Sequence, residues 1–519
     1  MQIWANPQED FKPPSSDDSQ EEPRTQQDHA YKPRTLLSRV YVVAAVFLLF
    51  LNFFLAQYDK FVLSYFQADV ISSLNLSSSD YGVLSGYATG IVYALLALPL
   101  AFVADYVKAR VWVLSVAALW WSLCVLFQGL SHNFWQILLA RIGMGIGQAP
   151  VEALSISLIS DLVDAKWLYV AESLFYVGVY VGEAVSGQIA TAFNKTGTPW
   201  NDALRAVGIV GMVLAVITRC ILREPARRSA IIPPIQASDD SLFASPLRRN
   251  WKFAHATRQI KASVSQIVRM RSFWLLTLSA GARQFSGNVF GYYMPSYMSS
   301  IYPSEMSLLS RYGIIVGVVG SVTVVAGGLI CTSSGKWRPY MPLYLTGVGG
   351  MISSIFVILM VFSRSLAGND ESKGVRILYG VMSAAYLTAE LWLGAFASLL
   401  ALLLPPQTKT FCLAIYTCTI ILIYSSAPQM IGLALRQYEP ESSAYIQKTR
   451  DILAILIPVG YWVAGIGFLL CIHKVKRDLR GDMVMAGRTS WRRKAGFVGF
   501  AVTLISLTVA LFVTSLVLR

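Results

Sequence analysis

Apolar runs of about 20 residues recur along almost the whole chain, and they constrain its fold more than any other feature. As an α-helix, a run of this length spans the ~30 Å hydrocarbon core of a bilayer. Backbone amides and carbonyls need partners within the protein when lipid surrounds them, so such runs form helices. Charged residues make up 14% of the 519 residues, against roughly 25% in soluble domains. The sequence therefore predicts an all-α polytopic membrane protein.

The runs fall into two sets of six. We expect the first set of crossings near residues 40–61, 81–103, 111–130, 134–160, 168–193 and 203–222. The second set is expected near 272–298, 311–331, 340–363, 376–404, 408–436 and 452–472. One more uncharged run, 495–518, is long enough to form a thirteenth crossing, with a hairpin in one leaflet as the alternative.

The segments between these runs differ in composition and define the expected domains. Residues 1–38 are polar and almost free of aliphatic residues, which predicts a disordered tail. The basic connection 223–271 is expected to form amphipathic helices on the membrane or a solvated linker. Basic segments favour the cytoplasm, which places the N-terminus there. The resulting domains are the tail 1–38, a six-helix bundle 39–222, the linker 223–271, a second bundle 272–473, a basic cytoplasmic segment 474–494 and the terminal segment 495–519.

Charge and motif content exclude several classes of function. The net charge of +14 is explained by cytoplasmic loops that face anionic lipid, so we expect no nucleic-acid partner. The six cysteines and four histidines lack metal-ligand spacing. No nucleophile elbow, P-loop or dinucleotide fingerprint stands in a suitable context. We therefore expect no cofactor, no metal and no enzymatic activity, and a monomer with membrane lipids as its neighbours.

Two six-helix halves around a cytoplasmic linker are typical of transporters. The stretch "LALPLAFVADYVKARVWV" between the second and third crossings resembles the loop signature of the major facilitator superfamily. The resemblance implies a gating loop in which Asp105 receives a helix dipole or an arginine, while Lys108 and Arg110 face cytoplasmic headgroups. The second half has an echo, "GGLICTSSGKWRPYMP", with the basic residues and no acid.

Three further stretches resemble the Spinster family within that superfamily. They are "LAQYDKFVLSYF", "FWQILLARIGMGIGQAPVEALSISLISDLV" and "LWLGAFASLLALLLPPQTKTFCLAIYT", in the order in which that family has them. The chain departs from the family at three places. Gln148 stands where the family has a glutamate, Lys60 stands where it has an arginine, and the run after Lys494 has no counterpart.

The resemblance implies a secondary active transporter that works by alternating access. Its substrate would be an anionic amphiphile such as a lysophospholipid or a phosphorylated sphingoid base, with or without proton coupling, in a lysosomal, endosomal or plasma membrane. One alternative is a porter of the same superfamily for a small organic anion or sugar. Another is a membrane receptor or scaffold that transports nothing.

Polar residues at membrane depth are the candidates for the site, because intramembrane charge is costly. At ~100° per residue, Arg141, Gln148 and Glu152 share one stripe of the fourth crossing. Glu152 either replaces the missing glutamate as the titrating group, or coupling at this site is lost. Asp59 lies at the depth of Arg141, and the expected pair either lines a cavity or only locks two helices.

The second half offers a similar pair. Arg283 and Glu390 stand midway along the seventh and tenth crossings, and the resemblance places crossings 1, 4, 7 and 10 around a central cavity. Arginine binds phosphate or carboxylate in a bidentate way, so two arginines favour an anionic headgroup. The expected substrate-binding residues are Arg141, Arg283, Gln148 and Asn288, and the proton-coupling or ion-pair residues are Asp59, Glu152 and Glu390. Further candidates are Gln284, Tyr292, Tyr293, Glu172 and Glu183.

Overall fold

The structure is a computed structural model. It describes residues 36–76, 80, 83–107, 109–225, 261, 264–305, 308–335, 339–368, 370–404, 409–435, 437–438, 442–479 and 491–517. Residues 42–519 form one unit, and the arrangement described below is that of this unit. Residues 1–35 of the predicted disordered tail, most of the predicted linker and much of the segment 474–494 lie outside the described residues, whereas residues 36–38 of the tail are helical.

The first set of crossings ends at α9. It consists of α1 (Leu36–Tyr65), η1 (Val83–Tyr87) with α4 (Ala88–Val107), α5 (Arg110–Gln128), α6 (Phe134–Gln148) with α7 (Val151–Leu162), α8 (Leu168–Thr196) and α9 (Trp200–Ile221). A short helix, α2 (Gln67–Ser73), follows α1. Each expected crossing of this half coincides with one helix or with two consecutive helices.

The second set begins at α11. It consists of α11 (Arg271–Ile301), α12 (Leu308–Ile315) with η2 (Val316–Gly320) and α13 (Ser321–Ser333), α14 (Met341–Val361), α16 (Glu371–Ala389) with α17 (Leu393–Leu403), α18 (Lys409–Tyr424) with α19 (Ser426–Leu435), and α20 (Ser443–Leu479). The short α15 (Ser363–Leu366) follows α14, and α21 (Trp491–Val517) ends the described chain. We call the end of the bundle where α9 ends and α11 begins the linker end, and the opposite end the far end.

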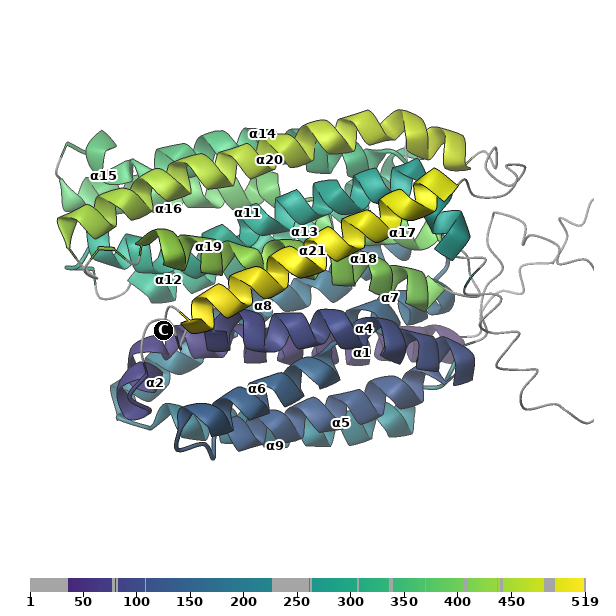
Figure 1. Cartoon of the computed structure of the whole chain (residues 1–519), viewed down its shortest axis with the longest axis horizontal. Helices are drawn as coiled ribbons and strands as arrows, with labels where there is room; N and C mark the ends of the chain where they lie inside the picture. Colours follow the sequence, from purple (N-terminus) through teal and green to yellow (C-terminus); the bar gives the residue numbers. More distant parts are fainter. Residues whose placement is uncertain are drawn as a thin grey trace, which may run out of the picture. The chain divides into compact units, whose positions relative to one another are not determined.

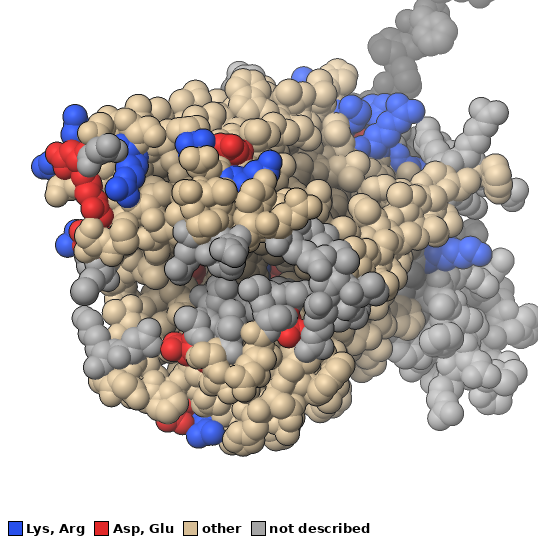
Figure 2. Space-filling model, turned by 60° about the vertical axis from the view of Figure 1, so that its left-hand side comes forward, with Lys and Arg blue, Asp and Glu red and all other residues tan. Residues whose placement is uncertain are grey.

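These helices suit a lipid environment. Among the residues that the structure describes, ten helical segments are long and apolar enough to cross a membrane, and the second crossing and α21 contain the shorter apolar stretches Ala88–Ala104 and Ala495–Leu511. Figure 2 brings the far end toward the viewer: charged side chains are scattered over that end, whereas the flank seen at the right is mostly uncharged. No strand occurs in the part of the chain that the structure describes. The prediction of an all-α polytopic membrane protein is confirmed.

Two crossings are interrupted near their midpoints. The fourth breaks between Gln148 and Val151, where Pro150 lacks an amide hydrogen and its ring disfavours a continuous helix. The tenth breaks between Ala389 and Leu393. Broken helices are typical of transporter binding sites, because the ends of the half-helices present polar groups to a ligand. The expected crossings 134–160 and 376–404 are therefore correct in extent and wrong in continuity.

The two halves pack together through α8 and α4. Helix α8 lies against α12, η2, α13 and α17, and α4 lies against α18; Figure 1 shows the helices of both halves running along the same direction. Small residues permit a close approach at the linker end. A Cβ at Gly394 would lie 2.2 Å from Ser173 Cα, and one at Gly328 would lie 2.7 Å from the Tyr169 carbonyl oxygen.

Helix α21 lies along the outside of the unit and contacts both halves. It packs against α18 and α19 of the second half and η1 of the first, and the Trp274 ring contacts those of Phe497 and Phe500 at 5.2 and 6.0 Å. Figure 1 shows it running from the linker end to the far end. Its 27 residues extend ~40 Å at 1.5 Å per residue. This length favours a full crossing over a hairpin.

A larger side chain at Gly394 should keep the halves from closing at the linker end, because Ser173 leaves no room for it. We expect Gly394→Val to raise the rate at which a thiol reagent labels Ser160→Cys, a buried position at this end, in a background without the six native cysteines. Gly380→Val on α16 is the matched control, because a Cβ there meets nothing within 4 Å. Equal labelling in the two variants would contradict the packing described.

If α21 crosses the membrane, the chain crosses an odd number of times. Epitope tags at the two termini should then be reached by antibodies from opposite sides of sealed vesicles. Finding both tags on one side would show that α21 does not span the bilayer.

Candidate functional site

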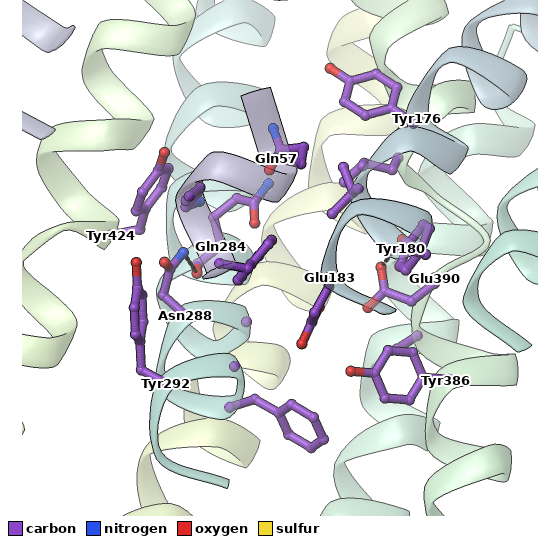
Figure 3. A pocket seen from close by; sticks show the side chains of 18 of the residues that line it. Gln57, Tyr176, Tyr180, Glu183, Gln284, Asn288, Tyr292, Tyr386, Glu390 and Tyr424 are labelled. Carbon is purple, nitrogen blue, oxygen red and sulfur yellow. Dashed lines mark hydrogen bonds between the residues drawn. The ribbon is translucent and has the colours of Figure 1, made fainter. Parts of the chain in front are cut away.

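A cavity lies inside the unit, between the two halves. It is lined by α1, α7 and α8 of the first half and by α11, α14, α16, α17, α18 and α20 of the second. Its volume of about 170 Å³ is below the ~300–1,000 Å³ of sites that enclose a drug-sized ligand. It therefore has room for a polar headgroup or a small metabolite, but not for a whole lipid with its chain. Figure 3 shows the polar and aromatic side chains that surround it.

One wall carries a charged cluster at the break in the tenth crossing. Arg283 Nη2 donates to the Ala389 carbonyl oxygen at 2.9 Å and lies 3.4 Å from Glu390 Oε1. The guanidinium stacks on Tyr461, with Cζ 4.0 Å from the ring centroid. The Tyr180 hydroxyl, from α8 of the other half, donates to Glu390 Oε2 at 2.6 Å. Because Glu390 ends α16, the helix break lets its carboxylate meet both groups.

Lys60 of α1 supplies the cation of the cavity wall. Its Nζ lies 5.4 Å from the Phe61 ring centroid and 5.3 Å from that of Tyr424, distances typical of cation–π contacts. The carboxylates that act on it electrostatically are Glu152 and Glu183. Within the described residues it forms no ion pair and no hydrogen bond. Its ammonium group is therefore available to an anionic ligand.

Glu152 lines the cavity from the first turn of α7. Its Oε1 accepts a hydrogen bond of 2.6 Å from the Tyr176 hydroxyl. Pro150 starts this helix and so turns the carboxylate toward the cavity. The location agrees with the expectation that Glu152 takes part in the site, and its coupling role stays a prediction.

Glu183 also points into the cavity, as Figure 3 shows. It was predicted only as a further candidate, although it stands alone among apolar residues in "VYVGEAVSG". The same signal applies to Glu172, which is fully buried and does not line the cavity. Periodicity could not separate the two, because which face of α8 meets the cavity depends on the packing of α1, α13 and α17.

Four of the predicted binding and coupling residues do not line the cavity; they are Arg283, described above, and Arg141, Gln148 and Asp59. Arg141 is buried, with Asp59 and Tyr292 among its electrostatic partners. Gln148 donates to the Ala56 carbonyl oxygen of α1 at 3.4 Å. The structure places Asp59 near Arg141, as expected, but away from the cavity. Arg141, Gln148 and Glu152 all have partners on α1, as a common stripe would require, but only Glu152 lines the cavity.

The polar residues of α11 divide in the same way. Gln284, Asn288 and Tyr292 line the cavity, and Asn288 donates to the Gln284 carbonyl oxygen at 2.9 Å. Tyr293 instead packs against α19, where its hydroxyl donates to the Pro428 carbonyl oxygen at 2.7 Å. The expected contribution of Asn288 therefore agrees with its position.

The predicted gating loop is only partly described. Lys108 and the side chain of Asp105 lie outside the described residues. Arg110 was expected to face lipid headgroups, and this expectation is wrong: it is 1% exposed and lies 2.7 Å from both Asp161 and Glu224. Two carboxylates offset the cost of burying the guanidinium group. Removing either carboxylate would leave the buried positive charge incompletely compensated.

The same cluster links the two halves at the linker end. Lys409 of α18 lies 3.5 Å from Asp161 and donates to Ser160 Oγ at 2.9 Å. Thr410 donates to Ser157 Oγ at 3.0 Å. We call these contacts, together with the Arg110 ion pairs, the linker-end seal. The seal consists of polar contacts, which can exchange for contacts with water when the halves separate.

The chain matches known proteins over most of its length. Residues 49–428 match the sequence model of the Major Facilitator Superfamily. The probable L-galactonate transporter of Escherichia coli is 24% identical over 365 residues, covering 69% of this chain and 76% of that protein. Protein spinster homolog 1 of Xenopus laevis is 23% identical over 478 residues, 89% of this chain and 87% of its own.

Two further matches point to the Spinster proteins. The sphingosine-1-phosphate transporter SPNS2 of Danio rerio is 22% identical over 350 residues, 64% of this chain and 65% of its own. The crystal structure of a bacterial homolog of the human lysosomal transporter Spinster, inward-facing and unoccupied, superposes with a TM-score of 0.58 at 21% identity, covering 84% of this chain and 98% of that one. The chain therefore belongs to the Major Facilitator Superfamily, whose members are transporters and not enzymes, and among them it is similar to the Spinster proteins.

Proposed function

We propose that the central cavity is the substrate site of a secondary active transporter that works by alternating access. Its substrate is an amphiphile with an anionic headgroup, such as a lysophospholipid or a phosphorylated sphingoid base. The observation that carries this proposal is Lys60, a cation at membrane depth without an ion pair among the described residues. Such a charge is costly unless a ligand meets it.

The positions of the two arginines do not support the expectation that both bind the headgroup. Arg283 is held by Glu390, Tyr461 and a carbonyl oxygen, and Arg141 lies outside the cavity. Lys60 is then the residue that meets the anionic group. The aromatic walls around it suit the first carbons of an attached chain, and the small volume suits a headgroup. The similarity to Spinster proteins supports a lipid substrate.

A small organic anion is the second candidate. The volume of about 170 Å³ accommodates it, and one relative is named as an L-galactonate transporter. A receptor or scaffold role is the third. We also propose that the protein resides in a lysosomal, endosomal or plasma membrane, with its N-terminus in the cytoplasm.

Alternating access is supported by the linker-end seal. Its contacts join α7 of the first half to α18 of the second, and a transporter needs one barrier that closes while the other opens. Breaking the seal exposes Asp161, Arg110 and Lys409 to the linker side, where water would solvate them.

Lys60→Met should abolish uptake of an anionic lysophospholipid into proteoliposomes, because it removes the cation and keeps the length of the side chain. Lys60→Arg should retain uptake, since it keeps the charge and matches the residue of the family. Fluorescent lysophospholipid, sphingoid base phosphate and a labelled sugar acid should be compared in one assay. Uptake of the sugar acid alone would favour the second candidate, and uptake of none would favour a receptor or scaffold.

Glu152→Gln should remove the dependence of transport on a pH gradient while equilibrium exchange of substrate persists, if Glu152 carries the coupling proton. The amide keeps the shape and the contact with Tyr176. Glu371→Gln, at the start of α16 near Ser304, is the matched control. Adding Gln148→Glu should restore nothing, because Gln148 does not line the cavity. Persisting pH-driven accumulation in Glu152→Gln would assign the coupling elsewhere.

A further inference from the structure

We infer that Glu172 of α8 is a proton-binding group that favours closure of the two halves at the linker end while it is protonated. Loss of its proton to water favours separation of the halves at that end. The pH on the linker side therefore controls the opening. This inference rests on the alternating access of the proposed function, and it does not depend on the identity of the substrate.

The Glu172 side chain is enclosed by protein. Its exposed fraction is 0%, and within the described part of the chain neither carboxyl oxygen has a hydrogen-bond partner. A carboxylate that lacks hydrogen bonds and an ion pair is costly at membrane depth. A neutral carboxyl group avoids most of this cost, so the closed arrangement favours the protonated acid.

The residues beside Glu172 join the two halves at the linker end. Ser173 lies so close to α17 that a Cβ at Gly394 would be 2.2 Å from its Cα. The Leu168 carbonyl oxygen, one turn earlier on α8, accepts a hydrogen bond of 3.3 Å from Ser398 Oγ of α17. The second half therefore helps to shield Glu172 from water, and separation of the halves at this end would let water reach its carboxyl group.

The groups that face Glu172 place it between the cavity and the linker-end seal. Its electrostatic partners are Glu152 of α7, which lines the cavity, and Lys409 of α18, which belongs to the seal. The phenol of Tyr176 lies one turn further along α8. The other elements around this part of α8 add no charge: α17 has no titratable side chain, α1 contributes the Phe53 ring, and α13 contributes the buried thiol of Cys331.

The cation that acts on Glu172 is already paired. Lys409 Nζ lies 3.5 Å from Asp161, which also pairs with Arg110, and Arg110 pairs in turn with Glu224. These two cations and two carboxylates balance, so an ionised Glu172 would add a negative charge to the closed linker end. Water would solvate that charge once the halves separate. The closed state thus binds the proton more tightly than the open state, and a rise in pH favours opening by linkage.

The test measures opening directly. Spin labels are attached to Ala165→Cys and Ser333→Cys, in a background without the six native cysteines. Both positions are exposed at the linker end, one in each half. Distances between the labels are measured in the substrate-free full chain, in lipid nanodiscs, from about pH 5 to about pH 8. The ratio of the open to the closed population should rise at least about fivefold over this range.

Glu172→Gln keeps the shape of the side chain and removes the titrating proton, so the ratio should change by less than about twofold over the same range. Glu371→Gln is the matched control and should keep the wild-type rise. A full pH response in Glu172→Gln, or none in the wild-type protein, would overturn the inference. If Glu172→Gln does not fold, Glu172→Met, which also lacks a titrating group, replaces it with the same expected result.

The outcomes separate this inference from the proposed function. Opening that depends on pH and on Glu172, in a protein that takes up neither a lysophospholipid nor a sphingoid base phosphate, would support the inference and overturn the lipid substrate. Uptake of either lipid by a protein whose label distances do not respond to pH would overturn the inference and leave the transporter standing.

Discussion

The cost of a charge surrounded by lipid governs this structure. Apolar helices form the flank of the described unit, and several charged side chains at membrane depth lie in ion-pair clusters or against the cavity. Arg110, Asp161 and Lys409 form one such cluster at the linker end. Arg283 and Glu390 form another in the cavity wall. The same cost is the reason that we propose Lys60, which has no ion pair among the described residues, as a ligand of the substrate.

The two charged clusters differ in position: one joins the halves at the linker end, and the other lies beside the cavity. The linker-end seal joins the two halves through charges and hydroxyl groups, while glycines on α13 and α17 let α8 approach closely. Glu390 of the second half meets Tyr180 of the first within the cavity. A ligand bound between α1, α8 and α11 would therefore touch both halves, so its binding is coupled to their relative position. Helix α21, which contacts both halves from outside, adds a constraint that a twelve-helix plan lacks.

The carboxylates of Glu152 and Glu390 line the cavity beside breaks in their helices. The breaks occur at equivalent places in the two halves, in crossings 4 and 10. One places Glu152 in the first turn of α7, and the other places Glu390 at the end of α16. In the first half the cause can be found in Pro150. In the second half no proline marks the break, and the Leu391 carbonyl oxygen instead lies 1.9 Å from where a Cβ of Gly327 would be.

The sequence by itself determined the class of fold, the positions of the long apolar helices and the family, because hydrophobicity over ~20 residues and short motifs are local properties. It also singled out Glu152 and Glu390, which line the cavity, since an isolated charge in an apolar run is visible without any structure. Tertiary structure decided which charges meet the cavity. Arg141 and Gln148 share the fourth crossing with Glu152 and also have partners on α1, yet only Glu152 lines the cavity. The burial of Arg110 and the position of Glu183 in the cavity wall likewise depend on residues more than 40 positions away in the sequence. A local sequence pattern does not contain this information.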